Sequence, residues 1–211
     1  MWTAGLSHRS FFRFLGPGGV PMAREHPIGI DLGTTFSAVA WVDESGRTAM
    51  IRNAEGDLLT PSVVLFSEEE TAVGKEARTA TSVHPELVVE WVKRDMGQPY
   101  YMRAIRGKKL PPEVIQSCIL RKLKLDAVNA LGQCDRVVIT VPAYFDEPRR
   151  KATADAAELA GLKLLDIVNE PTAAALAFGE TLGYLSSSAG AKHEMTLLVY
   201  DLGGGTFDAT L

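Results

Sequence analysis

Three consecutive glycines near the C-terminal end of the chain restrict its fold more than any other feature, because glycine is a poor residue for a strand. They lie in the string Tyr-Asp-Leu-Gly-Gly-Gly-Thr-Phe-Asp, residues 200–208. Apolar residues on both sides predict one strand into the turn and another out of it. Successive backbone N–H groups in such a hairpin bind anions, and flanking carboxylates can hold a divalent cation through water. We interpret this string, the second clamp, as a phosphate-binding turn rather than an ordinary glycine-rich loop.

A string of the same kind lies near the other end of the chain. Ile-Asp-Leu-Gly-Thr-Thr-Phe-Ser covers residues 30–37, and a strand is expected to follow at Ala38–Val42. We call this string the first clamp. Asp31 and Asp201 each close an apolar strand, where an acidic side chain is costly without a charged partner. We therefore expect both aspartates to be functional.

The two strings together resemble the actin-like ATPase superfamily, and IDLGTTFS and DLGGGTFD are similar to strings of the 70-kilodalton heat-shock protein (DnaK-type chaperone) family. The resemblance covers about residues 27–211. It implies an α/β chain with the actin-like ATPase (ribonuclease H-like) fold. It also implies lobe I of the nucleotide-binding domain, with a core at about 27–52 and 112–211 and a small inserted subdomain at about 53–111. We expect lobe II and the substrate-binding domain to be absent, so that nucleotide binding is weak and hydrolysis weak or absent.

The segments between the clamps alternate between strand and helix patterns. Strands are expected at 28–32, 38–42, 47–51, 63–66, 100–105, 137–141, 164–168 and 195–200, with helical signals in 68–94 and helices at 112–131, 147–160 and 171–180. Pro85 and Glu86 open one apolar helical face, and Asp146 is expected to cap the helix that follows it. A layout that alternates in this way is typical of a doubly wound fold, which binds ligands at the carboxyl ends of its strands.

The clamp chemistry and the resemblance together imply a nucleotide site. The expected nucleotide-binding residues are Gly33, Thr34, Thr35, Phe36, Gly203, Gly204, Gly205 and Thr206, the metal-binding residues Asp31, Asp201 and Asp208, and the catalytic residues Arg78, Glu170, Asp201 and Thr206. The implied cofactors are ATP or ADP and Mg²⁺, held mostly through water, with K⁺ as a further candidate. Glu170 matches the family's glutamate that faces the cation, and Thr206 matches its threonine near the γ-phosphate. Without the family, Glu170 reads as an acidic residue at a helix N-terminus.

One position departs from the family pattern. The family has a catalytic lysine in a Gly-x-x-Ala-Lys string, whereas Gly74–Arg78 places an arginine there. A planar guanidinium does not replace a compact ammonium where a water must attack. We therefore expect slow hydrolysis with binding retained. Lys75 lies nearly one helical turn away and is expected to point elsewhere.

Pro142 and Arg150 match the family's proline switch and relay arginine, which couple nucleotide state to a substrate-binding domain. The other interpretation is that Pro142 only ends a strand and Arg150 is a surface residue. The resemblance further implies three partners: unfolded client peptides through the domain absent here, a J-domain co-chaperone and a nucleotide exchange factor.

Several other classes are disfavoured by the sequence. A net charge of −4 gives no reason to expect nucleic acid or an anionic membrane as a partner. No apolar run reaches the roughly 20 residues that span a bilayer, and no string matches a P-loop. An actin-superfamily kinase or phosphatase, a filament-forming relative and an inactive gene remnant stay open as alternatives.

Residues 1–26 carry Arg9, Arg13 and Arg24 with few acidic residues, which fits an organelle transit peptide. We favour a start codon assigned too early, because Met22 is itself a plausible beginning. In both cases we expect disorder before about Pro27. We expect a cytoplasmic protein, or an organellar one if residues 1–26 are a transit peptide.

Overall fold

The structure is a computed structural model that describes residues 26–68, 70–184, 195–204 and 207–211. Its strands are β1 (Ile28–Leu32), β2 (Phe36–Val42), β3 (Thr48–Ile51), β4 (Thr60–Pro61), β5 (Val64–Phe66), β6 (Thr71–Val73), β7 (Val88–Val89), β8 (Arg136–Val141), β9 (Lys163–Asn169), β10 (Val199–Leu202) and β11 (Phe207–Thr210). Its helices are α1 (Lys75–Ala80), α2 (Pro112–Leu131), α3 (Glu147–Leu159) and α4 (Glu170–Thr181), with 3-10 turns η1 (Pro85–Leu87) and η2 (Val92–Asp95).

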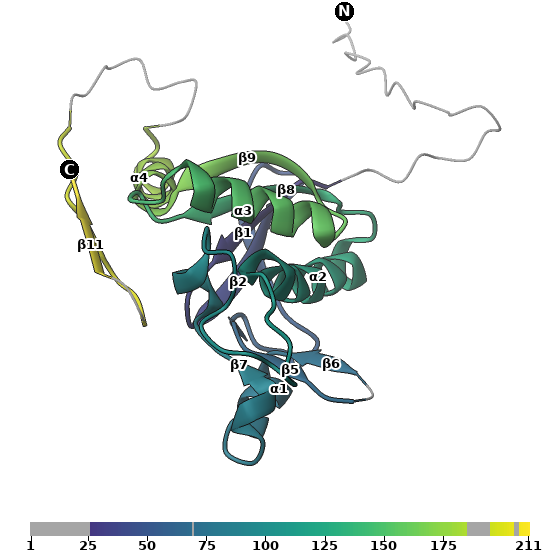
Figure 1. Cartoon of the computed structure of the whole chain (residues 1–211). Coiled ribbons are helices and arrows are strands. Elements are labelled where there is room, and N and C mark those ends of the chain that lie inside the picture. The colour runs from purple at the N-terminus through teal and green to yellow at the C-terminus, as the bar shows by residue number, and fades with distance from the viewer. Residues whose placement is uncertain (1–25, 69, 185–194, 205–206) are drawn as a thin grey trace, which may run out of the picture.

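The main sheet has the strand order β3-β2-β1-β8-β9, and the short strand β4 pairs with β2 outside this path. Strand β1 runs parallel to β8, and β8 runs parallel to β9, whereas β2 is antiparallel to β1 and β3. Helices α2 and α3 pack against each other beside this sheet (Figure 1). Parallel strands joined through helices place their carboxyl ends on one edge, where β1 ends next to the first clamp.

The core lies between the sheet and helix α2. The helix expected at 112–131 is confirmed, and its apolar residues Ile115, Ile119 and Leu123 are all buried in the main hydrophobic cluster. They pack with Ile30 of β1 and Ile139 of β8. The helix ends before Gly132, whose φ of 84° favours glycine. An apolar residue at every fourth position was therefore sufficient to predict both the helix and its buried face.

A second, antiparallel sheet has the order β6-β5-β7 and packs against α1. Figure 1 draws it in blue, apart from the main sheet. Strand β4 leads into it, and its residues Thr60 and Pro61 pair with Ser37 and Phe36 of β2. The second sheet is thereby joined to the chain that leaves the first clamp.

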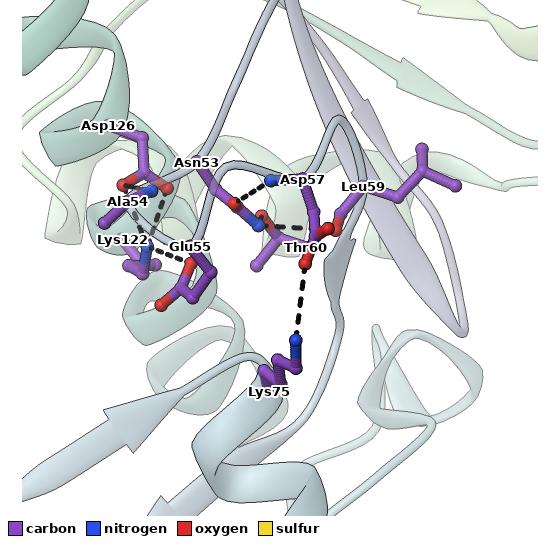
Figure 2. Close-up of polar contacts among 9 residues, drawn as sticks. All are labelled: Asn53, Ala54, Glu55, Asp57, Leu59, Thr60, Lys75, Lys122 and Asp126. Carbon is purple, nitrogen blue, oxygen red and sulfur yellow. Dashed lines mark hydrogen bonds and ion pairs between the residues drawn. The ribbon is translucent and has the colours of Figure 1, made fainter.

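Polar contacts fix the loop that precedes β4 (Figure 2). Asn53 accepts from the Asp57 backbone N–H at 2.7 Å, and its side-chain amide donates to Thr60 Oγ1 at 3.2 Å. Asp126 of α2 is only 4% exposed. It accepts from the Ala54 backbone N–H at 3.2 Å and from the Lys122 ammonium at 2.8 Å. The network ties the loop to a core helix.

Two expected elements differ from the structure. The helical face from Pro85 is instead the turn η1 followed by β7, because the β-branched pair Val88–Val89 is buried and pairs with β5. The strand expected at 100–105 does not form, and its end makes only an isolated bridge. Buried Tyr101 and Ile105 hold this segment, and Arg103 donates to the Val88 carbonyl. Contacts of these side chains, rather than backbone pairing with a neighbouring strand, hold the segment in place.

The expectation that the strand before the second clamp belongs to the doubly wound layout is also wrong for the described residues. Strand β10 pairs with β11 alone, in a two-stranded sheet that Figure 1 places beyond α4. A glycine-rich hairpin string fixes its antiparallel partner, but it does not specify a neighbour on the other edge. Among the described residues, no helix has the length and apolar character needed to cross a membrane.

Candidate functional site

The first clamp is a tight turn between β1 and β2. A Cβ added at Gly33 would overlap the carbonyl oxygen of Phe36, so the turn requires glycine. Two hydrogen bonds from Ser62, the residue after β4, hold this turn. The Ser62 backbone N–H donates to the Thr35 carbonyl at 2.9 Å, and its hydroxyl donates to the Gly33 carbonyl at 2.8 Å.

The second clamp is the hairpin between β10 and β11. Asp201 and Asp208 are direct cross-strand partners, and like charges placed opposite one another are destabilising unless a cation is shared. Gly203 and Gly204 lie in the turn, whereas Gly205 and Thr206 lie outside the described residues. The hairpin therefore concentrates negative charge beside a glycine turn.

The two clamps face each other across one cavity of about 610 Å³. It is lined by Asp31, Gly33, Thr34, Thr35, Phe36, Leu59, Lys93, Thr140, Glu170, Ala173, Ala174, Val199, Tyr200, Asp201, Gly203 and Gly204. The approach is close, because a Cβ added at Gly204 would overlap the Thr35 side chain. Residues more than 160 positions apart in the sequence are thus brought to one site.

Asp31 lies at the end of β1 and accepts a hydrogen bond from Thr140 Oγ1 of β8 at 2.9 Å. Its side chain is exposed rather than buried, so the burial cost that the sequence suggested does not apply. The carboxylate instead opens into the main cavity. It is available to a ligand and is oriented by a neighbouring strand.

Glu170 begins α4 and forms an ion pair with Lys93, with Lys93 Nζ at 2.5 Å from Glu170 Oε1. Burial raises the pKa of the Glu170 carboxyl, Lys93 opposes that rise, and Asp31 and Asp201 add to it. The carboxylates of Asp31 and Asp201 are thus close enough to Glu170 to act on its charge. Sequence reasoning missed Lys93, which it placed only within the helical signals expected in 68–94.

Arg78 does not line this cavity. Its guanidinium carbon lies 5.1 Å from the centroid of the Phe36 ring. It lines two other cavities, of about 600 and 200 Å³, and the smaller of these also borders Thr35 and Gly204. The position that the resemblance assigns to a catalytic cation therefore lies outside the main cavity, against the Phe36 ring. Lys75 points away to Asp57, with 3.9 Å between the charged atoms.

The two relay candidates do not line the main cavity. Pro142 is buried directly after β8. Arg150 donates through Nε to the Phe145 carbonyl at 3.0 Å and through its terminal nitrogen to Asn169 Oδ1 at 2.5 Å. Asn169 immediately precedes Glu170, so Arg150 links the chain after β8 to the start of α4. The expected helix cap is confirmed, because Asp146 accepts from the Arg149 backbone N–H at 3.3 Å.

Two observations bear on which ligand fits. Thr35 Oγ1 is buried and has no hydrogen-bond partner within the described part of the chain. Because buried hydroxyl groups are normally hydrogen-bonded, this one can donate to an acceptor on a ligand, such as a phosphate oxygen. Over the same residues, no three Asp, Glu, His or Cys side chains gather closely enough to hold a metal directly. A cation here would be held partly by water or by the ligand, as Mg²⁺ commonly is.

Comparison with known proteins identifies relatives of this chain. A model of the family described as Hsp70 protein matches residues 27–106 and 98–211. The chain is 46% identical over 190 residues to proteins named chaperone protein DnaK in Thermotoga neapolitana, Thermotoga petrophila and Thermotoga maritima. Each alignment covers 89% of this chain and 30% of the relative.

These matches and the observed sheet with its helices confirm the expected α/β fold class, that of the actin-like ATPases. The chain spans about 30% of the length of the curated relatives it matches. Because the family model covers nearly the whole described chain, and the relatives agree with it, this protein belongs to the Hsp70 family.

Proposed function

We propose that this chain binds Mg·ATP between its two clamps and serves as the ATPase part of a DnaK-type chaperone that assists protein folding. One observation carries the proposal. The main cavity is lined by both Asp-Leu-Gly turns and by the carboxylates of Asp31, Glu170 and Asp201. Its relatives are chaperones by name, so neither a kinase nor a filament-forming ATPase is favoured.

The phosphate-binding part of the proposal rests on the clamp backbones. Glycine at 33 and 204 leaves room that a Cβ would fill, and successive N–H groups in such turns favour phosphate. The unpartnered hydroxyl of Thr35 supplies a further donor. We propose that residues 33–36 and 203–206 cradle the phosphates, with Thr206 near the terminal one.

Bound Mg²⁺ would neutralise charge on the phosphates and make the terminal phosphoryl group easier to transfer to water. In our proposal Asp31 and Asp201 hold the cation's water shell, with Asp208 beside Asp201. Glu170 orients water, and its ion pair with Lys93 holds the carboxylate in place. Arg78 lies farther away, on the Phe36 ring, which supports the expectation of slow hydrolysis.

We further propose that Pro142 and Arg150 couple the site to a client-binding domain like that of the longer relatives. The supporting contact is the bond from Arg150 to Asn169, the neighbour of Glu170. Unfolded client peptides, a J-domain co-chaperone and a nucleotide exchange factor would then be the partners.

Isothermal titration of the chain with Mg·ATP and Mg·ADP tests the function. We expect binding by the parent chain and at least about tenfold weaker binding by Asp201→Asn, because charge-assisted contacts are the strong ones. Asp155→Asn is the matched control, since Asp155 is a partly exposed α3 residue that does not line the main cavity and pairs with Lys151 at 2.6 Å. A folded chain that binds neither nucleotide, or an Asp201→Asn chain that binds as tightly as its parent, contradicts the proposal.

A further inference from the structure

Asp31 lies in the interior of the main sheet, with a strand on each side of it. Its backbone pairs with Ala38 of β2 on one side and with Thr140 of β8 on the other. Because the backbone is held from both sides, the carboxylate can change its position only by rotation of its own side chain. That side chain is exposed, so packing alone does not select one of its rotamers.

A row of four residues crosses the sheet at this point. Its members are successive partners in β2, β1, β8 and β9, namely Ala38, Asp31, Thr140 and Val168. Partners on neighbouring strands point to the same face of a sheet. Alanine and valine side chains have no hydrogen-bonding group. Within this row, Thr140 is therefore the residue whose side chain can hold the Asp31 carboxylate by a hydrogen bond.

The Thr140 hydroxyl makes this contact. Its Oγ1 donates to Asp31 Oδ1 at 2.9 Å, and both residues line the main cavity. The second carboxylate oxygen, Oδ2, has no hydrogen-bond partner among the described residues. Hydrogen bonds to an ionised acceptor are among the stronger kinds. One contact from β8 thus orients a carboxylate of the cavity wall and leaves one of its oxygens for a ligand.

We propose that Thr140 is a positioning residue, which holds Asp31 in the orientation needed to accept from the water shell of Mg²⁺ on a bound nucleotide. The inference rests on the proposed function, because the cation arrives with the nucleotide. A cation held through water depends on the orientation of the carboxylates around it. Loss of a residue that orients such groups commonly weakens metal binding by about 10- to 100-fold.

The choice of cation separates this role from a purely structural one. Mg²⁺ demands near-ideal octahedral geometry and keeps several of its waters, whereas Ca²⁺ accepts flexible coordination. If Thr140 orients Asp31, loss of its hydroxyl should weaken binding of Mg·ATP more than binding of Ca·ATP. If Thr140 only supports the sheet, its loss should weaken binding of both complexes by the same factor.

The experiment is isothermal titration of the full chain with Mg·ATP and with Ca·ATP, with circular dichroism as the check of folding. Thr140→Val keeps the branched shape that suits a strand and removes only the hydroxyl. We expect it to bind Mg·ATP about tenfold more weakly and to change Ca·ATP binding by less than about threefold. Thr140→Ser keeps the donor, so it should recover most of the lost Mg·ATP affinity.

Thr153→Val is the matched control. Thr153 is 1% exposed on α3, and its hydroxyl donates to the Arg149 carbonyl at 2.9 Å. It does not line the main cavity. The variant therefore removes a threonine hydroxyl that is remote from Asp31, and it should bind both complexes like the parent chain.

The outcomes distinguish failure of this inference from failure of the proposed function. If a folded parent chain binds neither complex, the proposed function fails and the inference fails with it. If the parent binds Mg·ATP and Thr140→Val binds it equally well, only the inference is overturned. It is likewise overturned if Thr140→Val weakens both complexes by the same factor, or if Thr140→Ser loses as much Mg·ATP affinity as Thr140→Val. Where the parent binds Mg·ATP alone, the comparison between these two variants decides.

Discussion

The two clamps carry the same Asp-Leu-Gly string in different surroundings. The first joins β1 and β2 inside the main sheet, where Leu32 is 3% exposed and Ser62 holds the turn. The second joins β10 and β11, which pair only with each other among the described strands, and its Leu202 is 71% exposed. One turn is built into the core, and the other rests on α4 and the first clamp.

The comparison shows which properties of a clamp come from its own string and which come from the elements packed around it. The shared string encodes a strand end, a carboxylate and a backbone without Cβ atoms, which is ligand chemistry. Rigidity comes from the surrounding elements, and an isolated two-stranded hairpin is marginally stable in water. A ligand that contacts both clamps would therefore stabilise the second one more than the first.

The largest expected effect comes from truncating one apolar side chain in the strands that neighbour each clamp. Ile139 of β8 is 0% exposed, so Ile139→Ala should lower the free energy of unfolding by about 2–5 kcal/mol. Leu202 of β10 is mostly exposed, and Leu202→Ala should stay within about 0.5 kcal/mol of the parent. Urea unfolding followed by circular dichroism measures both.

A surface substitution away from both clamps, Leu159→Ala on α3, serves as the control, since Leu159 is 50% exposed. It should match Leu202→Ala in size. If Leu202→Ala is as damaging as Ile139→Ala, the second hairpin is part of the core, and the two clamps do not differ in their support.

Much of the fold could be predicted because local patterns and burial agree. The apolar face of α2, its stop at Gly132 and the Asp146 cap each follow from side chains within a turn or two. The segments at 85–92 and 100–105 could not, because distant partners decide them. Arg103 donates to the Val88 carbonyl, and Val88 pairs with β5. Sequence periodicity carries no information about such pairings.

The residues of the candidate site likewise include some that the sequence could predict and some that it could not. Asp31, Glu170 and Asp201 were selected from strings and all line the main cavity. Lys93 was not, and the turn that carries it begins at Trp91, whose left-handed backbone no residue preference predicts for tryptophan. Arg78 was selected from its string position, but its guanidinium packs on Phe36 outside that cavity.

An intermediate effect is expected from adding one methyl group to each clamp. Gly33→Ala would push against the Phe36 backbone carbonyl within the sheet, and it should cost about 1–3 kcal/mol of stability. Gly204→Ala meets the Thr35 side chain instead. Because its hairpin pairs with no other strand among the described ones, we expect unchanged unfolding but at least about tenfold weaker Mg·ATP binding. Thermal unfolding and isothermal titration together distinguish the two variants.

Gly29→Ala controls for the loss of a strand glycine, because its added Cβ would have only the Ala40 carbonyl oxygen near, at 3.9 Å. It should leave both stability and binding close to the parent values. Equal loss of stability in Gly33→Ala and Gly204→Ala would mean that the two turns are equally embedded in the fold.

The smallest effect should come from removing one contact that supports the first clamp, so that this turn has less support from its neighbours, as the second clamp does. Ser62→Ala removes the hydroxyl that binds the Gly33 carbonyl and Ser37 Oγ, at 2.8 and 2.9 Å. We expect a loss of about 1 kcal/mol in unfolding free energy and a measurable loss of Mg·ATP affinity, because the turn is less well held. Ser117→Ala removes a buried hydroxyl that donates within α2 to Val114 at 2.7 Å, so it should lower stability alone. If both variants bind Mg·ATP like the parent chain, the Ser62 hydroxyl does not shape the first clamp, and the turn string alone sets its geometry.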